Sequence, residues 1–373
     1  MNLSNRMLTD TKFSGTGLSD LKLSDIETPA LVLDLDILEE NMAVMQSFLD
    51  GHPVKLRPHF KTSKCVEIVK RQLAKGAKGI TCSKLSEAGI LVEAGVPDIL
   101  IANEIVQKSK IERAAGYAKK TRLTLCADQK QNILDLNEAA EKAGSTIHIY
   151  IEFDVGMNRC GVSTYEAFYE LAKLVSECPH LRFEGIQAYA GQLSHEENVA
   201  YKKEQILAVE KKLAGLKQYV EDRGIKMNQI SGGSTNTSLL KAGHGVYTEL
   251  QAGSYVYMDA AFKNCSLPYH NSLFLLTTVI SKSPDRIILD AGAKGLGLDQ
   301  VLPVCKGYET YKYVVSEEHF GIYGSDLHAK IGDQVWMIPG HCCTTVNLYP
   351  QMYVKRGDRI VDIWKVEGSL KSV

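Results

Sequence analysis

Residues 54–60, VKLRPHF, together with residues 63–76, SKCVEIVKRQLAKG, contain the pattern that decides the fold. A short run of alternating apolar and polar residues precedes a longer run whose apolar side chains have helical spacing. The same succession returns in residues 79–82, GITC, and 84–95, KLSEAGILVEAG. A strand followed by a helix, repeated every ~25 to 40 residues, is typical of a parallel sheet.

Further strand candidates continue this alternation to residue 233. Counting the first of them, ALVLD, the chain has eight candidates, each followed by a segment that can be helical. We therefore predict an α/β fold with a (β/α)8 TIM barrel, and a doubly wound open sheet is the competing architecture. The other six candidates are ALVLDL (30–35), DILIANE (98–104), RLTLCAD (122–128), IHIYIEFD (147–154), FEGIQAY (183–189) and MNQISGG (227–233).

The pattern changes after residue 261. Runs such as SLFLLTTVIS (272–281) and DRIILDAG (285–292) are separated by turn signals and have few helical stretches between them. This texture predicts a second, all-β domain. We expect a barrel over 29–261 and a β-domain over 262–373. The polar residues 1–28 are expected to form an arm or a strand that joins the β-domain.

Composition limits the possible partners. The chain has 373 residues, of which 45% are hydrophobic and 23% charged, and its formal net charge is -1. This balance gives no sign of nucleic-acid or membrane binding, so small molecules or a second copy are the expected partners. Nine scattered cysteines and an opening without a secretion signal predict a cytoplasmic protein without a disulfide framework.

Polar and glycine-rich residues collect just after the predicted barrel strands. In barrel enzymes the loops at the carboxyl ends of the strands converge on one mouth, where the chemistry takes place. The sequence therefore predicts an active site at this end. The residues that follow strands are His59, Lys61, Ser83, Asn103, Glu104, Arg159, Tyr189, His195, Gly232, Gly233, Ser234 and Thr235.

Two of these features point to one cofactor. The loop SGGSTNTS (231–238), with LQAGSY (250–255) after it, offers backbone N–H groups and hydroxyls that can bind a phosphate. Lys61, on the opposite side of the same mouth, can form a Schiff base with an aldehyde. Pyridoxal 5'-phosphate has both groups, so the combination predicts this cofactor.

The stretch PGHCCTTVN, residues 339–347, suggests a metal site in the β-domain. If it is extended, His341 and Cys343 project to the same face, because side chains alternate along a strand. An imidazole and a thiolate suit zinc best, whereas manganese or magnesium, the other candidate divalent ions, prefer carboxylates. The alternative is a buried cysteine pair beside a turn histidine.

Several stretches in order resemble one family: the fold-type III pyridoxal-phosphate enzymes, in particular the D-threonine aldolase and D-serine dehydratase group. They extend from about residue 28 to 348. The resemblance implies an alanine racemase-like barrel with a β-domain, usually as a homodimer. The stretches are TPALVLDLD, RPHFKTSK, DVGMNRCGV, GIQAYAGQLSH, VYTELQAGSYVYMD, SLFLLTTVISK, ILDAGAK, SEEH and PGHCCTTVN.

The resemblance also implies roles for individual residues. Lys61 would be the Schiff-base lysine, and Arg159 would bond the cofactor's phenolic oxygen. Ser83 and Tyr189 would line the ring. His341 and Cys343 would hold the metal that binds the substrate's β-hydroxyl. The phosphate would be held by Thr235 with Gly233, Ser234, Gly253, Ser254 and Tyr255.

One histidine separates the two branches of the family. His195 stands where the aldolases have the base proposed to take the hydroxyl proton, a position that dehydratases typically lack. Cys343, in contrast, matches the dehydratases, since aldolases generally have aspartate there. The contexts QAY and LQAGSY also resemble the aldolases. We therefore expect a carbon–carbon lyase of the D-threonine aldolase type, with catalytic Lys61 and His195.

Two alternatives stay open. The first is a zinc-dependent D-serine or D-3-hydroxyaspartate dehydratase, in which Lys61 would abstract the Cα proton and ammonia would be released. The second is a non-enzymatic pyridoxal-phosphate carrier, because single-domain barrel relatives bind the cofactor without known turnover. The second domain with its His341 and Cys343 pair argues against the carrier, since a carrier needs no metal.

Overall fold

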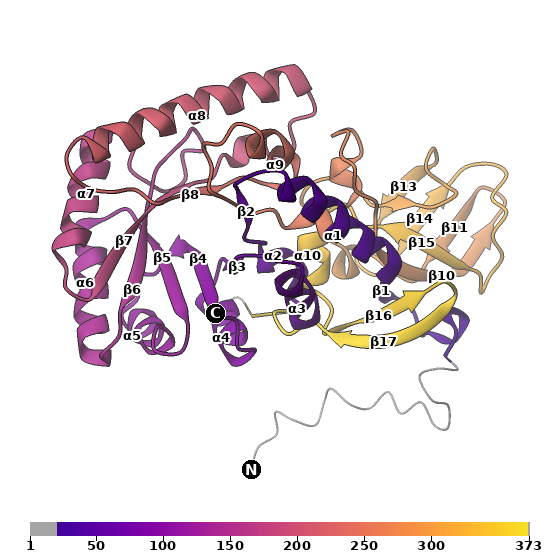
Figure 1. The fold of residues 1–373 in the computed structure, drawn as a ribbon. Coiled ribbons are helices and arrows are strands. Elements are labelled where there is room, and N and C mark those ends of the chain that lie inside the picture. The colour runs from indigo at the N-terminus through magenta and orange to yellow at the C-terminus, as the bar shows by residue number, and fades with distance from the viewer. Residues whose placement is uncertain (1–20, 372–373) are drawn as a thin grey trace, which may run out of the picture.

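The computed structural model describes residues 21–371, and eight parallel strands within this range close into a barrel (Figure 1). Their order is β2-β9-β8-β7-β6-β5-β4-β3, and a bridge between His59 and Thr81 joins the outer pair. The barrel predicted from the alternating pattern is therefore confirmed. The strands are β2 (Lys55–Leu56), β3 (Ile80–Cys82), β4 (Asp98–Glu104), β5 (Arg122–Ala127), β6 (Ile147–Glu152), β7 (Leu181–Ala188), β8 (Gln229–Gly232) and β9 (Glu249–Leu250).

Helices cover the outside of the barrel and bury one face each against the strands. Strands such as β5 are buried on both sides, which explains why they appear in the sequence as nearly continuous apolar runs. The helices are α1 (Leu35–Asp50), α2 (Phe60–Ser63), α3 (Val66–Ala74), α4 (Leu85–Glu93), α5 (Lys108–Tyr117), α6 (Lys130–Ala143), α7 (Tyr165–Glu177), α8 (Val199–Glu221) and α9 (Thr235–Ala242).

The second domain is a mostly antiparallel sheet with its own apolar core. In Figure 1 it lies at the right, beside the barrel. Its predicted all-β character is confirmed, apart from one short helix, α10 (Cys342–Val346). Its strands are β1 (Ala30–Asp34), β10 (Leu273–Ser283), β11 (Arg286–Leu289), β12 (Val304–Cys305), β13 (Lys312–Val315), β14 (Phe320–Tyr323), β15 (Gln334–Ile338), β16 (Gln351–Arg356) and β17 (Arg359–Lys365).

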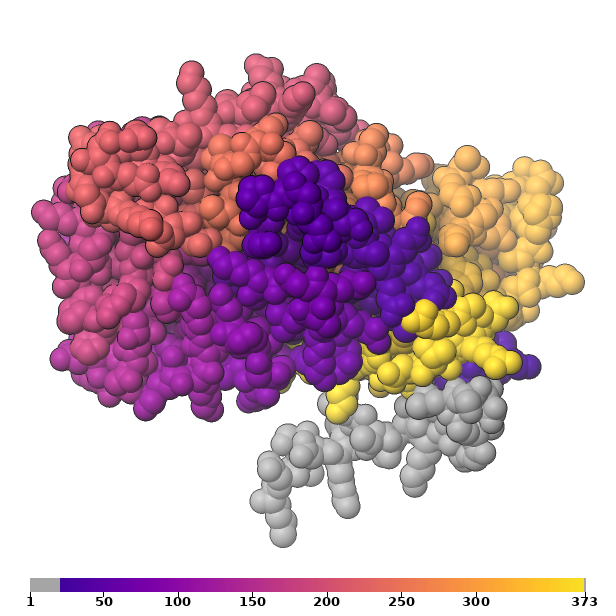
Figure 2. Space-filling view, in the orientation of Figure 1, coloured from indigo at the N-terminus to yellow at the C-terminus, as the bar shows by residue number. Residues whose placement is uncertain are grey.

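The assignment of the first strand was wrong. β1, predicted to open the barrel, pairs antiparallel with β10 and parallel with β16 in the β-domain sheet. In Figure 2 the yellow carboxyl-terminal strands accordingly lie against the indigo start of the described chain. The eighth barrel strand is β9, which has only two residues. Every residue of β1 is buried, so the apolar pattern could not reveal which sheet the strand joins.

The predicted arm at 1–28 falls mostly on residues 1–20, which lie outside the described residues. Within the described part, Lys22 forms an isolated bridge to Arg359. Leu21 and Ile26 pack in a small apolar cluster with residues of β1, β10 and β16. Among residues 21–371, the structure contains no helix with the length and apolar character needed to cross a membrane.

A buried arginine holds together the strands where the barrel closes. Arg57, which follows β2, donates from Nε to Glu249 Oε1 at 3.0 Å and from its two terminal nitrogens to Asp98 at 2.8 and 3.2 Å. Glu249 also accepts from Lys78 Nζ at 2.9 Å and from the Tyr150 hydroxyl at 3.1 Å. Burial opposes the charge of Glu249, but Arg57 and Lys78 outweigh it and lower the pKa of this carboxyl. One guanidinium therefore connects β2, β4 and β9.

We expect Arg57→Met to lower the free energy of unfolding by about 3–5 kcal/mol, because Asp98 and the buried Glu249 lose the guanidinium that they share and Glu249 keeps only Lys78 as a cation. Denaturant unfolding of the full chain measures this loss. Arg286→Met is the matched control, since its partner Asp285 is exposed and such a pair contributes at most about 1 kcal/mol. If the two variants unfold at the same denaturant concentration, Arg57 does not stabilise the closure of the barrel.

Candidate active site

Lys61 lies in the single-turn helix α2, directly after β2. The residue before this helix, His59, accepts a hydrogen bond at Nδ1 from the backbone N–H of Lys61 (3.4 Å). Its Nε2 lies 3.4 Å from Ser83 Oγ. Burial, helped by the charges of Lys61 and Arg159, holds the pKa of His59 well below its usual value. The imidazole is therefore neutral, with its proton on Nε2, and it fixes the start of α2 without adding charge.

Tyr189 lies between the two predicted cationic groups. The centroid of its ring is 5.6 Å from Lys61 Nζ and 5.5 Å from Arg159 Cζ. Its hydroxyl is 2.8 Å from Ser194 Oγ, a hydrogen bond that keeps the ring in place. The structure thus brings Lys61, Tyr189 and Arg159 together at the carboxyl ends of the strands.

The immediate partner of Arg159 is a buried carboxyl group. Glu152 Oε1 lies 3.7 Å from the arginine. Burial, with the nearby charge of Glu104, raises the pKa of Glu152 to about 8. Glu152 therefore holds its proton more tightly than an exposed carboxyl does, which weakens the neutralisation of Arg159 and favours its pairing with another anion. No spacing rule pointed to Glu152.

The first half of the predicted phosphate loop lies at the start of α9. Gly233 has φ +84, a backbone conformation that side chains disfavour. Ser234 is the residue before the helix, and its N–H donates to Thr237 Oγ1 at 2.9 Å. In the first helical turn the Thr237 N–H donates to the Ser234 carbonyl at 3.1 Å, whereas the N–H groups of Thr235 and Asn236 have no partner among the described residues. This geometry suits an anion such as a phosphate.

The second half of the loop is joined to the first by a hydrogen bond. Tyr255 donates its backbone N–H to Thr235 Oγ1 at 3.0 Å, within the turn Gly253–Ser254–Tyr255. A Cβ on Gly253 would stand 2.5 Å from Thr62 Oγ1, so only glycine allows this turn to approach α2. These contacts therefore bring the two predicted phosphate segments together with the helix of Lys61.

The predicted metal ligands lie at the amino end of α10, and here the local prediction was wrong. His341 is extended, but Cys343 belongs to the helix, so the pair is not part of a strand. Even so, the two side chains interact directly. A hydrogen bond from Cys342, together with the hydrogen bond and the charge of His341, holds the pKa of the Cys343 thiol well below its usual value, although burial opposes the shift. The structure thus places His341 beside a thiol that loses its proton readily.

Asp299 orients His341. Its Oδ2 lies 2.7 Å from His341 Nδ1, and its Oδ1 accepts a bond of 2.6 Å from Thr344 Oγ1. Burial opposes the charge of His341, but the interactions with Cys343 and Asp299 raise its pKa to about 9. Because Asp299 holds Nδ1 of His341, the other ring nitrogen, Nε2, is the one that would bind a metal. Histidine ligands of metal sites are commonly held by a carboxylate in this way. Sequence reasoning missed Asp299 because no spacing rule connects it with His341.

His195 lies beside this pair. Its ring centroid is 4.9 Å from that of Phe262. Burial and the charge of His341 lower the pKa of His195, although Cys343 and Asp299 oppose the shift. His195 is therefore neutral at pH 7, as a general base must be.

Contacts between the domains bring the metal pair to the barrel mouth. The Cys342 backbone N–H donates to the buried Asp259 carboxylate at 2.8 Å, and the Ala260 N–H donates to the Pro339 carbonyl at 3.0 Å. Thr62, next to Lys61, has its hydroxyl 3.2 Å from Cys343 Sγ. Asp259 and Thr62 are further residues that the sequence did not reveal.

The residues fit both groups that the sequence predicts. The glycine turns leave room for a phosphate, with Lys61 nearby for an aldehyde. Among residues 21–371, no group of three His, Cys, Asp or Glu side chains could hold a metal. A metal on His341 and Cys343 would therefore keep positions open for water and substrate, and an imidazole with a thiolate suits zinc best.

Comparison with known proteins gives matches over almost the whole chain. The alanine racemase, N-terminal domain family matches residues 33–261, and the putative serine dehydratase domain matches residues 272–355. A D-threonine aldolase from Arthrobacter sp is 38% identical over 93% of each chain. A 3-hydroxy-D-aspartate aldolase from Paracoccus denitrificans (strain Pd 1222) is 35% identical over 97% of this chain and 99% of the relative. The crystal structure of D-threonine aldolase from Filomicrobium marinum superposes with a TM-score of 0.92, at 32% identity, over 96% of this chain and all of the other.

We expect Asp299→Ala to weaken zinc binding by about 10- to 100-fold, because His341 loses the carboxylate that orients its ring. Competition with a chromophoric chelator measures the affinity of the full chain. Asp285→Ala removes an exposed carboxylate elsewhere in the β-domain and should leave the affinity unchanged. An unchanged affinity in Asp299→Ala would exclude this role for the carboxylate.

Proposed function

The chain belongs to the alanine racemase-like, fold-type III family and has its serine dehydratase domain, and we propose that it is an aldolase for D-3-hydroxy amino acids. It would cleave D-threonine or a related substrate to glycine and an aldehyde, using pyridoxal phosphate and a divalent metal. The observation that carries this proposal is the contact of the metal pair with the helix of Lys61, where the Thr62 hydroxyl lies 3.2 Å from Cys343 Sγ. His195 is neutral and close enough to His341 for that charge to lower its pKa.

The barrel residues would bind and orient the cofactor. The turns at Gly233–Thr235 and Gly253–Tyr255 would hold its phosphate, Arg159 would pair with its phenolic oxygen, and Ser83 and Tyr189 would line the ring. When bound, pyridoxal phosphate supplies an aldehyde for Lys61 and a sink for the electron pair that bond cleavage leaves at Cα. Members of this family are pyridoxal-phosphate enzymes, and some of them depend on a metal.

His195 would take the proton from the substrate's β-hydroxyl. It is neutral at pH 7, and it faces His341 and Cys343, which would hold the metal that makes this hydroxyl more acidic. Loss of the proton leaves the electron pair on oxygen, a carbonyl forms, and the Cα–Cβ bond breaks.

A dehydratase is the second candidate, and two observations favour it. The β-domain matches the putative serine dehydratase domain, and the metal pair includes Cys343. In that reaction Lys61 would remove the Cα proton, the hydroxyl would leave, and a 2-oxo acid and ammonia would form. His195 argues for the aldolase, because a dehydratase needs no base at the hydroxyl. A metal pair beside Lys61 equally argues against a cofactor carrier.

The homodimer and the choice of zinc are also part of the proposal. The thiolate of Cys343 favours zinc over manganese and magnesium. Small D-3-hydroxy amino acids are the expected substrates.

Product analysis tests the proposed reaction. With pyridoxal phosphate and zinc, we expect D-threonine and D-3-hydroxyaspartate to yield glycine and the corresponding aldehyde, because His195 would take the proton of the β-hydroxyl. Chromatography of the amino acid and an enzymatic assay for the aldehyde detect both products. Release of ammonia and a 2-oxo acid, without glycine, would instead identify a dehydratase. Absence of any product from D-threonine, D-serine and D-3-hydroxyaspartate would favour the carrier.

Two active-site variants should separate the role of the base from that of the Schiff-base lysine. We expect His195→Ala to lower kcat by about 10²- to 10⁴-fold while the protein stays yellow, because only the proton acceptor is lost. Lys61→Ala should lose the visible absorbance of the bound cofactor. His328→Ala, an exposed histidine of the β-domain, is the control and should retain full activity. Full turnover in His195→Ala would contradict the aldolase assignment.

A further inference from the structure

Lys241, on α9, is a buried cation without a partner. Its side chain is completely inaccessible to solvent (0%), and its Nζ makes no hydrogen bond or ion pair with any residue of 21–371. The ammonium lies over the ring of Tyr247, whose centroid is 3.7 Å away. An unpaired charge in the interior is costly, so the position of this lysine needs a physical explanation.

The lysine lies directly behind the phosphate loop. Its Cδ is 3.4 Å from the point where a Cβ on Gly233 would stand. The ring of Tyr247, which the ammonium contacts, comes within 2.9 Å of the corresponding point on Gly232. The ammonium therefore lies beneath the Gly232–Gly233 turn, at the end of β8 where α9 begins. Leu250 Cδ2 and Thr237 Oγ1 also lie near the Gly233 point, at 3.1 and 3.8 Å, so the lysine packs against the loop together with these side chains.

No internal group neutralises this cation well. Burial lowers the pKa of Lys241 to about 7, and Glu210 of α8 only partly opposes the shift. One carboxylate oxygen of Glu210 is hydrogen-bonded to His244 Nδ1 at 2.6 Å. Burial raises the pKa of Glu210. Its other oxygen has no partner, and Tyr247 brings no charge. The remaining place for an anion near Lys241 is the phosphate loop itself.

We propose that Lys241 is the buried counter-charge of the cofactor's phosphate, acting across the Gly232–Gly233 turn rather than by direct contact. This inference rests on the proposed function, because it assumes that the loop binds a phosphorylated pyridoxal. A charge held in a low-dielectric interior acts more strongly over several ångströms than one in water. Lys241 would therefore favour binding of pyridoxal phosphate over unphosphorylated pyridoxal. Binding of the phosphate would also raise the pKa of Lys241, so that its amine takes up a proton.

Binding of pyridoxine 5'-phosphate and pyridoxine tests the inference without any turnover. Neither compound has an aldehyde, so Lys61 cannot react, and the ratio of the two affinities reports the phosphate alone. We expect Lys241→Met, in the full chain freed of cofactor, to reduce this ratio at least about tenfold at pH 8, with pyridoxine binding unchanged. Isothermal titration measures both affinities.

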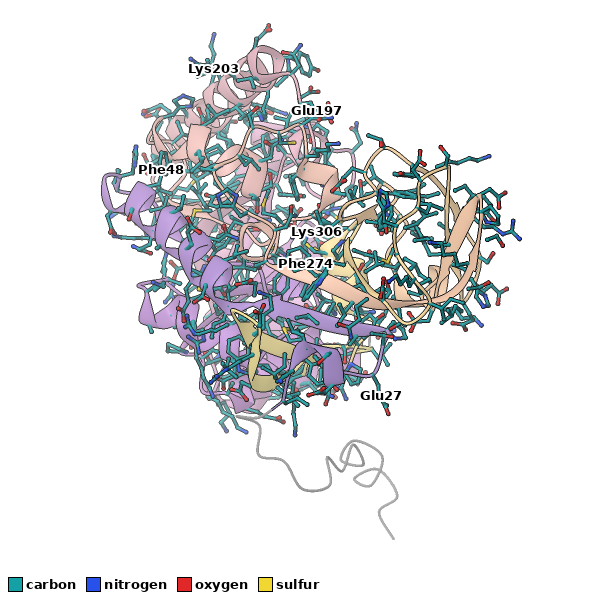
Figure 3. The ribbon with its side chains drawn as sticks, turned by 90° about the vertical axis from the view of Figure 1, so that its right-hand side faces the viewer. Glu27, Phe48, Glu197, Lys203, Phe274 and Lys306 are labelled. Carbon is teal, nitrogen blue, oxygen red and sulfur yellow. The ribbon has the colours of Figure 1, made fainter. Side chains whose placement is uncertain are left out.

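Lys306→Met is the control for the loss of one positive charge. Lys306 also lies over an aromatic ring, with Nζ 5.1 Å from the centroid of Phe274, and Figure 3 labels the two side by side in the β-domain. This variant should keep the wild-type ratio. If Lys241→Met also keeps that ratio, the inference is wrong.

Proton uptake provides a second measurement that needs no variant. At pH 8 the wild type should take up more protons when it binds pyridoxine 5'-phosphate than when it binds pyridoxine, by up to about one proton per site. Calorimetric titrations in buffers of different ionisation enthalpy measure this number. No additional uptake would overturn the inference.

Thermal stability separates a ligand-binding role from an internal one. Without ligand, Lys241→Met should melt at or above the wild-type temperature, because it removes a buried unpaired charge. Equal losses of melting temperature in Lys241→Met and Glu210→Gln would show that the lysine pairs with Glu210, and would refute the inference.

If the wild type binds neither pyridoxine compound nor pyridoxal phosphate, the proposed function fails as well. If it binds them and only the variant result is negative, the proposed function stands.

Discussion

The hydrogen bond from the Cys342 backbone amide to the buried carboxylate of Asp259 is the contact on which the active site depends. Lys61 and the phosphate loop belong to the barrel, whereas His341 and Cys343 belong to the β-domain. Burial raises the pKa of Asp259 to about 6, so the carboxylate is still ionised at pH 7 and accepts the amide strongly. Together with the contact between Thr62 and Cys343, this bond sets the position of the metal pair relative to the lysine.

Three histidines at this site differ in charge because their surroundings differ. His59 and His195 have lowered pKa values, since burial and neighbouring cations disfavour their protonated forms. His341 has the Cys343 thiol and Asp299 beside it, and its pKa rises to about 9. The same side chain is thus neutral or protonated at pH 7 according to its immediate partners, and a metal at His341 would have to displace its proton.

The sequence predicted the barrel and most of the mouth because both follow from local patterns. Lys61, Tyr189 and Arg159 were found from their positions after strands, and the structure brings them together. Partners that are distant along the chain were not predictable: Asp299 is 42 residues from His341, and Thr62 is 281 residues from Cys343. The strand β9 was missed because two residues form no periodic pattern, and β1 was misplaced because burial on both faces hides its neighbours.

The position of β1 has a consequence for the synthesis of the chain. This strand is among the first described residues to leave the ribosome, but one of its neighbours in the sheet, β16, begins only at residue 351. The barrel, with strands between residues 55 and 250, can pair its own strands well before that point. Nascent chains must therefore keep the apolar strand β1 without its β16 neighbour until the whole barrel and the metal pair at 341 and 343 have already been made.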